Sequence, residues 1–146
     1  MKITNKKAFY DFEILERLEA GINLKGAEVK AVREGHADLT GSFVRISGSE
    51  AYLINAKIFP LAYARPEGYD EARTRKLLLH KSEIIALKGR MDGGGLSLVP
   101  TTMYDKRHLI KVEIALGRGR KKFQKKEVKK KADIVRSTEE EIASNY

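Results

Sequence analysis

Residues 42–59, SFVRISGSEAYLINAKIF, carry the clearest secondary-structure signal in the chain. Apolar and polar residues alternate on both sides of Gly48, which is typical of two half-buried strands joined by a glycine turn. The pattern predicts an antiparallel hairpin that ends at Pro60. The side chains expected to face inward are Val44 and Ile46 on the first strand and Tyr52, Ile54, Ala56 and Ile58 on the second.

One strand and one helix are predicted before this hairpin. Apolar residues alternate with acidic ones from residue 10 to residue 14, which predicts a half-buried strand, and we expect Gly21 to turn it. Residues 24–35, LKGAEVKAVREG, predict a short helix that ends at a glycine. Lys30 and Arg33 are then expected on the outer face of the helix.

The section after the hairpin predicts a loop, a buried strand and a second helix. Residues 62–73 contain Pro, Gly and mixed charge without periodicity, so we expect a long exposed loop. Residues 75–91, RKLLLHKSEIIALKGRM, predict a short strand with its leucines in the core. Ser82 suits the N-cap of a brief helix that stops at Gly89.

Two further strands are predicted towards the C-terminus. The first passes through Leu96 and Leu98, and Pro100 is expected to bend it or to end it at a sheet edge. The second is residues 111–116, KVEIAL, in which every second side chain is apolar and faces inward.

The predicted elements point to a mainly β fold with short helices. They amount to five or six short, mostly antiparallel strands and two or three brief helices, without the βαβ rhythm of a parallel sheet. Closure into a small barrel buries one face of many short strands and leaves few free edges. A two-layer α+β sandwich fits the pattern almost as well.

Most of the positive charge lies in residues 117–131, GRGRKKFQKKEVKKK. This basic segment carries +8, against +4 for residues 1–116, −3 for residues 132–146 and +9 for the whole chain. Such a segment repels itself and has few apolar side chains, so we expect it to stay loose until a polyanion neutralises it. With Phe123 available to stack on a base, its composition is typical of an arm that binds nucleic acid, although a solubilising tail is the alternative.

The composition also argues against several classes of protein. The chain has no cysteine, and its three histidines stand far apart, so we expect no metal site and no cofactor. We find no nucleophile motif and no pair of carboxylates suited to acid and base work, which argues against an enzyme. No apolar run approaches the roughly 20 residues that span a bilayer, and no signal peptide is visible, so we expect a cytoplasmic monomer that contacts no membrane.

Six segments follow one another along the chain: NKKAFYDFEI, EAGINLKGAEVKAVREG, SFVRI, YLINAKIFP, TRKLLLHKSEI and GRGRKK. In this order and at these distances they resemble the SsrA-binding protein (SmpB) family, whose members are the bacterial partners of transfer-messenger RNA. The resemblance covers essentially residues 5–131.

The resemblance implies an oligonucleotide-binding-type closed antiparallel β-barrel over residues 1–118, with two or three flanking helices. Residues 119–146 would form a flexible tail that is disordered when free and helical on the ribosome. The barrel would bind the tRNA-like domain of transfer-messenger RNA, and the tail would enter the decoding centre of a stalled small subunit and contact its ribosomal RNA. Elongation factor Tu and alanyl-tRNA synthetase would be reached indirectly, through the RNA.

The resemblance and the surface cations together give a set of expected contact residues. The RNA-binding set is Asn5, Lys7, Glu19, Gly21, Glu28, Lys30, Arg33, Arg75, Lys76, Leu78, His80 and Lys81. The decoding-centre set in the tail is Gly119, Arg120, Lys121, Lys122, Phe123, Lys125 and Lys126. The chain departs from the family at Asp38, where Asn is usual, and at residues 124–126, where Asp-Lys-Arg is usual and Gln-Lys-Lys stands here. The alternative is a general single-stranded nucleic-acid-binding barrel or a ribosomal protein with a basic arm.

Overall fold

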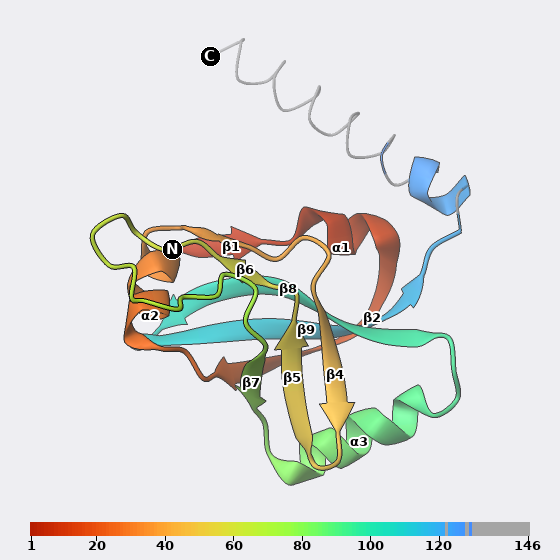
Figure 1. The fold of residues 1–146 in the computed structure, drawn as a ribbon. Coiled ribbons are helices and arrows are strands. Elements are labelled where there is room, and N and C mark those ends of the chain that lie inside the picture. The colour runs from red at the N-terminus through yellow and green to blue at the C-terminus, as the bar shows by residue number, and fades with distance from the viewer. Residues whose placement is uncertain (122, 128, 130–146) are drawn as a thin grey trace.

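The strands pair in a closed ring. The computed structural model describes residues 1–121, 123–127 and 129 (Figure 1). Within them the ring runs β8–β4–β5–β7–β2–β9, and β9 pairs back with β8. Every pairing among these residues is antiparallel, so the prediction of a mainly β, antiparallel fold with short helices is confirmed. The bounds are β1 Lys2–Thr4, α1 Lys6–Asp11, β2 Phe12–Ile22, α2 Gly26–Arg33, β3 Ala37–Asp38, β4 Phe43–Ser47, β5 Glu50–Ile54, β6 Lys57–Ile58, β7 Arg75–Leu78, α3 Lys81–Met91, β8 Leu96–Lys106 and β9 Leu109–Gly119.

The strands are longer than the sequence suggested. Strands β2, β8 and β9 have 11 residues each, whereas we predicted only short strands. Gly21 does not turn β2, because the strand continues to Ile22 and Gly21 pairs with Leu78 on one side and Lys111 on the other. Pro100 does not end β8 either.

Pro100 is tolerated because no neighbouring strand needs its missing N–H. On that side, β4 pairs with β8 only at Leu98 and β1 pairs from Thr102 onward, so Pro100 falls between them. Its carbonyl accepts a hydrogen bond from the Asn5 side chain at 2.8 Å. The ladder with β9 shifts register between Pro100 and Thr102, so the predicted local irregularity is present although the strand does not end.

The predicted hairpin is confirmed as β4–β5, but the phase of its second strand is wrong. Ser47 pairs with Glu50 across a two-residue turn in which Gly48 has φ +62°. The buried residues on β5 are Ala51 and Leu53, not Tyr52 and Ile54. Asn55 adopts φ +66°, which breaks the alternation before the correctly predicted Ala56 and Ile58.

One helix is as predicted, one is shifted and one was missed. Helix α2 matches the prediction, with Gly35 at φ +79° just after it and Lys30 and Arg33 exposed. Helix α3 begins after His80 rather than Ser82, because the Glu83 carboxylate accepts the His80 backbone N–H at 3.0 Å, and it continues through Gly89 to Met91.

Helix α1 replaces the first part of the strand predicted from residue 10. The Asn5 side chain accepts the Ala8 backbone N–H at 3.3 Å and so caps the helix. This local hydrogen bond decides the structure of Lys6–Asp11, and the alternating pattern takes effect only from Phe12.

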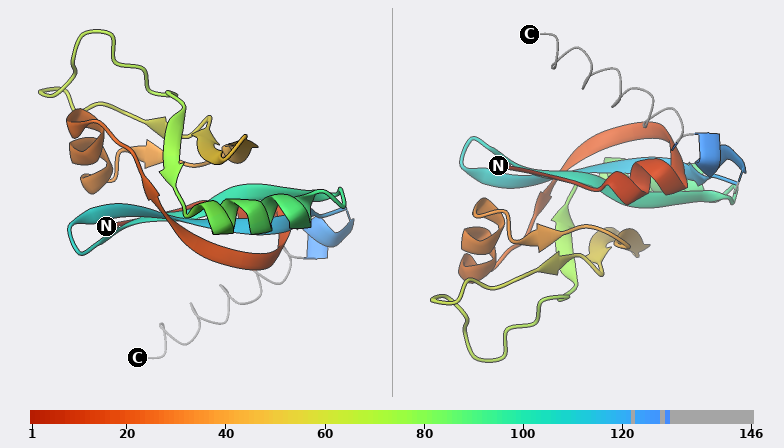
Figure 2. Two further views of the ribbon diagram at one scale, coloured as in Figure 1. Left: turned by 90° about the horizontal axis from the view of Figure 1, so that it is seen from below. Right: turned by 90° about the horizontal axis from the view of Figure 1, so that it is seen from above.

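A single hydrophobic cluster fills the ring and extends under two helices. Strand residues such as Leu53 and Ile114 pack with Val32 of α2 and Leu87 of α3. Not all three leucines of residues 77–79 are core, because Leu78 is 55% exposed. Figure 2 shows the loop over residues 62–73 projecting beside α2, in agreement with the predicted exposed loop.

Candidate nucleic-acid interface

Four of the predicted contact residues line one open groove beside β7 and the start of α3. Lys76, Leu78, His80 and Lys81 border a hollow of about 460 Å³, whose other wall comes from the β4–β5 turn at Ser49 and Glu50. The four are close because strand β7 runs directly into the helix. Two cations, an imidazole and an exposed aliphatic side chain are therefore presented together.

Gly21 lies directly beneath Leu78. A Cβ atom at Gly21 would meet the Leu78 Cβ at 3.1 Å, so only glycine leaves the leucine in its present position. The two residues are paired across β2 and β7, and this packing aims an apolar side chain at solvent where an ordinary strand residue would be polar.

The positive charge of Lys76 is held in place by its neighbours. Its ammonium contacts the Glu50 carboxylate at 3.0 Å, and the Tyr52 hydroxyl donates to the same carboxylate. The hydrogen bond to Tyr52, followed by that to Lys76, lowers the pKa of Glu50, and the bond to Glu50 raises the pKa of Lys76. Both groups are thus charged at neutral pH, and Lys76 stands over the groove as a cation.

Another predicted residue, Arg33, lies where α2 meets the β8–β9 hairpin. Arg33 donates to the His108 carbonyl at 2.9 Å and lies 3.5 Å from the Asp105 carboxylate. Arg107 and His108 form the two-residue hairpin turn and both have positive φ, at 52° and 66°. The turn is therefore strained and is held against α2 by the Arg33 side chain.

Glu19 lies on β2 among donors from β8. Its carboxylate accepts from the Tyr104 hydroxyl and from Lys106 at 3.2 Å. The bond from Tyr104 contributes most to lowering the pKa of Glu19, while burial and then this carboxylate raise the pKa of Tyr104. Glu19 is exposed, and both of its carboxylate oxygens already accept hydrogen bonds from β8.

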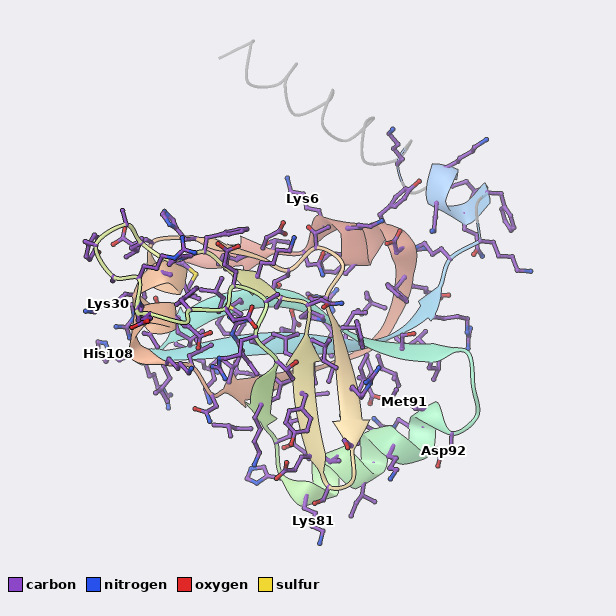
Figure 3. The ribbon with its side chains drawn as sticks, viewed as in Figure 1. Lys6, Lys30, Lys81, Met91, Asp92 and His108 are labelled. Atoms are coloured by element: carbon purple, nitrogen blue, oxygen red, sulfur yellow. The ribbon has the colours of Figure 1, made fainter. Side chains whose placement is uncertain are left out.

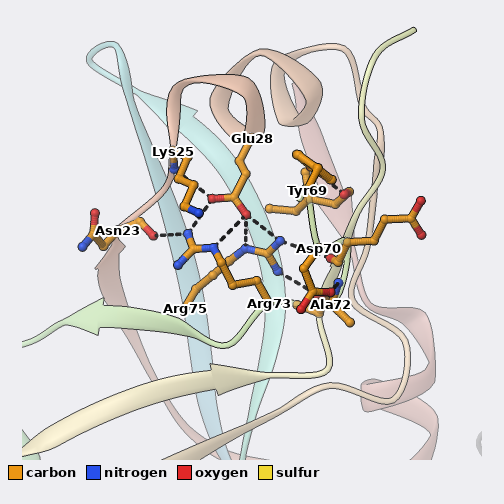
Figure 4. Close-up of polar contacts among 11 residues, drawn as sticks. Asn23, Lys25, Glu28, Tyr69, Asp70, Ala72, Arg73 and Arg75 are labelled. Atoms are coloured by element: carbon orange, nitrogen blue, oxygen red, sulfur yellow. Dashed lines mark hydrogen bonds and ion pairs between the residues drawn. The ribbon is translucent and has the colours of Figure 1, made fainter. Parts of the chain in front are cut away.

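Glu28 and Arg75 lie in the interior rather than on the surface (Figure 4). Arg75 was expected among the surface cations, but it is fully buried and contacts Glu28 at 2.7 Å through Nε. Arg73 approaches the same carboxylate at 2.5 Å. Burial by itself would raise the pKa of Glu28, but hydrogen bonds from Arg73, the Lys25 amide and Arg75 outweigh it and hold that pKa below its ordinary value.

This buried network ties the exposed loop to the body. The remaining Arg75 donors reach the carbonyls of Ala56 at 2.8 Å and Glu71 at 3.1 Å. Tyr69 donates to the Ile58 carbonyl at 2.7 Å. With no free surface, Glu28 and Arg75 act here as structural residues that fix α2 against residues 62–73.

Of the two predicted residues near the N-terminus, Asn5 is buried and Lys7 is exposed. Asn5 is buried, and its side-chain amide donates to the carbonyls of Pro100 and Leu39, so it holds α1 against β8. Lys7 is exposed on α1 and pairs with Asp11 at 3.0 Å. Lys7 is therefore an exposed but paired cation, whereas Asn5 has a role within the fold.

The described part of the tail begins on the body. Gly119 closes β9 opposite Phe12, and residues 123–127 form a helical turn beyond it, in blue in Figure 1. Phe123 is 61% exposed and Lys121 and Lys126 are exposed, which leaves an aromatic ring and two cations free to contact a partner. Lys122 and the part of the tail from residue 130 onward lie outside the described residues.

The predicted residues do not share one face. In Figure 3, the predicted contact residues Lys81 and Lys30 lie at two separate edges of the molecule. Sequence reasoning missed Arg73, the partner of Glu28, and the Ser49–Glu50 wall of the groove. Alternation predicted β5 and the run of leucines predicted β7, but only the pairing of the two strands places Tyr52 opposite Lys76 and so brings this wall to the groove.

Within residues 1–121, 123–127 and 129, no cluster of three or more His, Asp or Glu side chains is placed to hold a metal ion. Across the same residues, no helix combines the length and the hydrophobicity that crossing a bilayer requires.

Comparisons with known proteins agree with one another. The model of the SmpB protein family matches residues 2–144. The SsrA-binding protein of Sulfurihydrogenibium sp. (strain YO3AOP1) is 50% identical over 136 residues, which span 93% of this chain and 90% of the relative. That of Persephonella marina (strain DSM 14350 / EX-H1) is 45% identical over 143 residues, covering 98% of this chain and 91% of the relative.

A solved structure supports the same assignment. It is described as "tmRNA-SmpB: a journey to the center of the bacterial ribosome", and its matching chain is 46% identical with a TM-score of 0.69. The match covers 83% of this chain and 85% of that one. Because the family model spans nearly the whole sequence and the relatives share close to half of their residues with it, the chain belongs to the SmpB protein family.

Proposed function

We propose that the chain is an RNA-binding adaptor of trans-translation. It binds the tRNA-like domain of transfer-messenger RNA and delivers this RNA to stalled ribosomes, where the incomplete protein is tagged. Family membership and the groove formed by Lys76, Leu78, His80 and Lys81 carry the proposal. The adaptor acts in the cytoplasm as a monomer and performs no catalytic step. Elongation factor Tu and alanyl-tRNA synthetase meet it only through the RNA.

The groove suits the backbone and sugars of a folded RNA. Lys76 and Lys81 neutralise phosphates, and the His80 imidazole offers hydrogen bonds to a 2′-hydroxyl. Leu78 supplies an apolar contact to a ribose or an unstacked base. The closed antiparallel ring is an oligonucleotide-binding-type barrel in this proposal, and its value is rigidity, because shape is what distinguishes one folded RNA from another.

The remaining parts have separate roles. Residues 1–118 form the RNA-binding body, and residues 119–146 form the tail that enters the decoding centre. Exposed Lys7, Lys30 and Arg33 extend the positive surface around the body. Asn5, Glu28 and Arg75 support this surface from within, and Gly21 sets the position of Leu78.

A competition experiment at physiological salt tests the proposal. The full chain is bound to the labelled tRNA-like domain and challenged with unlabelled bulk tRNA or a homopolymer. Specific binding predicts that a large excess of either competitor, on the order of 1,000-fold, is needed for half displacement. Displacement at equal concentrations would mean that the chain is a general nucleic-acid-binding barrel.

The groove lysines are expected to set part of the salt dependence. Lys76→Gln and Lys81→Gln should each reduce the slope of log affinity against log salt by about 1, because one fewer counterion is released. The affinity loss should be larger for Lys76→Gln, since Glu50 then faces the RNA without its partner. The matched control is Lys88→Gln, an exposed lysine of α3 outside the groove lining. If Lys88→Gln changed the slope equally, the groove lysines would have no special contact with the RNA.

Gly21→Val is expected to weaken binding of the tRNA-like domain about tenfold by pushing Leu78 out of position, since overpacking of this kind costs about 1–3 kcal/mol. The titration is compared with that of Gly26→Val, because a Cβ at Gly26 meets nothing within 4 Å. Thermal unfolding of both variants shows whether the body stays folded. Unchanged affinity in folded Gly21→Val protein would remove Leu78 from the interface.

A further inference from the structure

The first turn of the tail contacts the end of α1, and two of these contacts are made by Asp11. The Asp11 carbonyl accepts the Arg120 backbone N–H at 2.8 Å, just after β9 ends. The Asp11 carboxylate lies 3.4 Å from the Lys125 ammonium. The same ammonium lies 5.9 Å from the centre of the Tyr10 ring, which is within cation–π distance.

Local hydrogen bonds join the described residues between these two contacts. The Gln124 side chain accepts the Lys121 backbone N–H at 2.9 Å, as the third residue of a capped helix does. The Lys125 backbone N–H then donates to the Lys121 carbonyl at 3.1 Å. Arg120 and Lys125 are therefore held by Asp11 at the two ends of one short turn, so the direction of the turn relative to the body is defined.

The contacts at Asp11 are individually weak and easily reversed. The side chains of Asp11 and Lys125 are 21% and 33% exposed, which limits the strength of their ion pair. Lys7 contacts the other carboxylate oxygen at 3.0 Å. Burial would raise the pKa of Asp11, but the bonds from Lys7 and then Lys125 outweigh it and lower that pKa. If Lys125 moves to a phosphate, Asp11 keeps Lys7 as its partner and no carboxylate is left unpaired.

We propose that Asp11 is a positioning residue that directs the tail away from the body at a fixed angle before the ribosome is reached. This inference rests on the proposed function of the tail and adds a residue of the body to it. A tail that leaves in a defined direction samples a smaller volume, so its effective concentration at the decoding centre is higher than that of a freely swinging one. The contact contributes to the rate of engagement and little to the stability of the fold.

Backbone ¹⁵N relaxation of residues 120–127 in the full chain tests the contact directly. Asp11→Asn keeps the shape of the side chain but removes its charge, and it should make these amides more mobile on the nanosecond timescale. Lys125→Gln should do the same. The double variant should be no more mobile than Lys125→Gln alone, because both substitutions break the same ion pair. Lys7→Gln, which removes the other cation at Asp11, should leave these amides unchanged.

Measurements of the tagging rate and of RNA affinity test whether the contact at Asp11 matters for function. Asp11→Asn should slow tagging several-fold and leave the affinity for the tRNA-like domain unchanged. Glu67→Gln is the matched control, since Glu67 is an exposed carboxylate of the loop. Unchanged amide mobility in Asp11→Asn, or raised mobility with full tagging, would overturn the inference. Failure of the unmodified chain to tag would instead refute the proposed function, while the relaxation comparison still reports on the contact.

Discussion

Ending the chain after Arg120 is expected to abolish tagging on stalled ribosomes. The truncation removes eight Lys or Arg residues and Phe123, and it leaves β9 and the Arg120 hydrogen bond to Asp11 intact. Losing as few as two charge-assisted contacts of about 1.5 kcal/mol each lowers the population of the ribosome-bound tail by more than a hundredfold. We therefore expect the tagging rate to fall by at least about 100-fold in a reconstituted translation reaction.

A chain that ends after Lys131 is the matched control. It keeps the whole basic segment and loses only residues 132–146, whose net charge is −3. Comparing the two truncations separates the contribution of the cations from that of the last fifteen residues. Full tagging by the chain that ends after Arg120 would show that the tail has no role at the ribosome.

Glu28→Ala is expected to be the most damaging single substitution in the body. It leaves Arg75, which is fully buried, with a charge that nothing neutralises. Breaking a buried pair in this way costs about 3–5 kcal/mol, which for a chain of this length corresponds to a fall in melting temperature of about 10 °C. Glu67→Ala, on the exposed loop, should cost less than about 0.5 kcal/mol. Urea unfolding of both variants measures the difference, and equal stabilities would mean that the network carries no energy.

The buried network around Glu28 also predicts how the stability of the fold changes with pH. The folded-state pKa of Glu28 lies below the ordinary value of 4.5, so the folded protein binds this proton less readily than the unfolded chain. The contribution of Glu28 to stability is therefore complete above about pH 4.5 and is lost as the pH falls through the lower folded-state pKa. When the free energy of unfolding is measured as a function of pH, Glu28→Gln should lose less stability at acidic pH than the unmodified chain. An equal loss in both would mean that other carboxylates cause the acid dependence.

Local pattern predicted the elements whose conformation is decided by their own residues. Alternation identified β4, β5 and β9, and the glycine at residue 35 marked the end of α2 correctly. The errors arose where one residue overrides the pattern. The positive φ of Asn55 changed the phase of β5, and the Asn5 side chain converted the start of a predicted strand into α1.

Long-range pairing explains what the sequence could not predict at the site. Lys76, Leu78, His80 and Lys81 are close in sequence, so a single motif predicts that they lie together. Arg75 reads as a surface cation because arginine is rarely buried without a partner, and its partner Glu28 lies 47 residues away. No periodicity in either segment indicates that the two residues meet.

The contact between Asp11 and Lys125 could not be predicted from local pattern either. Asp11 and Lys125 are separated by most of the chain, and they meet because β9 ends beside the start of β2. The departure from the family at Gln124 acquires a structural meaning only here, because its side chain caps the first turn of the tail. A charge count predicted a basic arm but not the point at which it is attached.

The central claim is that the folded body recognises the RNA and that the tail acts afterwards. Its most direct test is the dissociation constant of the tRNA-like domain at physiological salt, measured side by side for the full chain and for the chain that ends after Arg120. The truncated chain loses part of the general electrostatic attraction, so we predict a dissociation constant within about tenfold of that of the full chain. A loss of affinity of several hundredfold would contradict the account, because the tail would then be the element that binds the RNA.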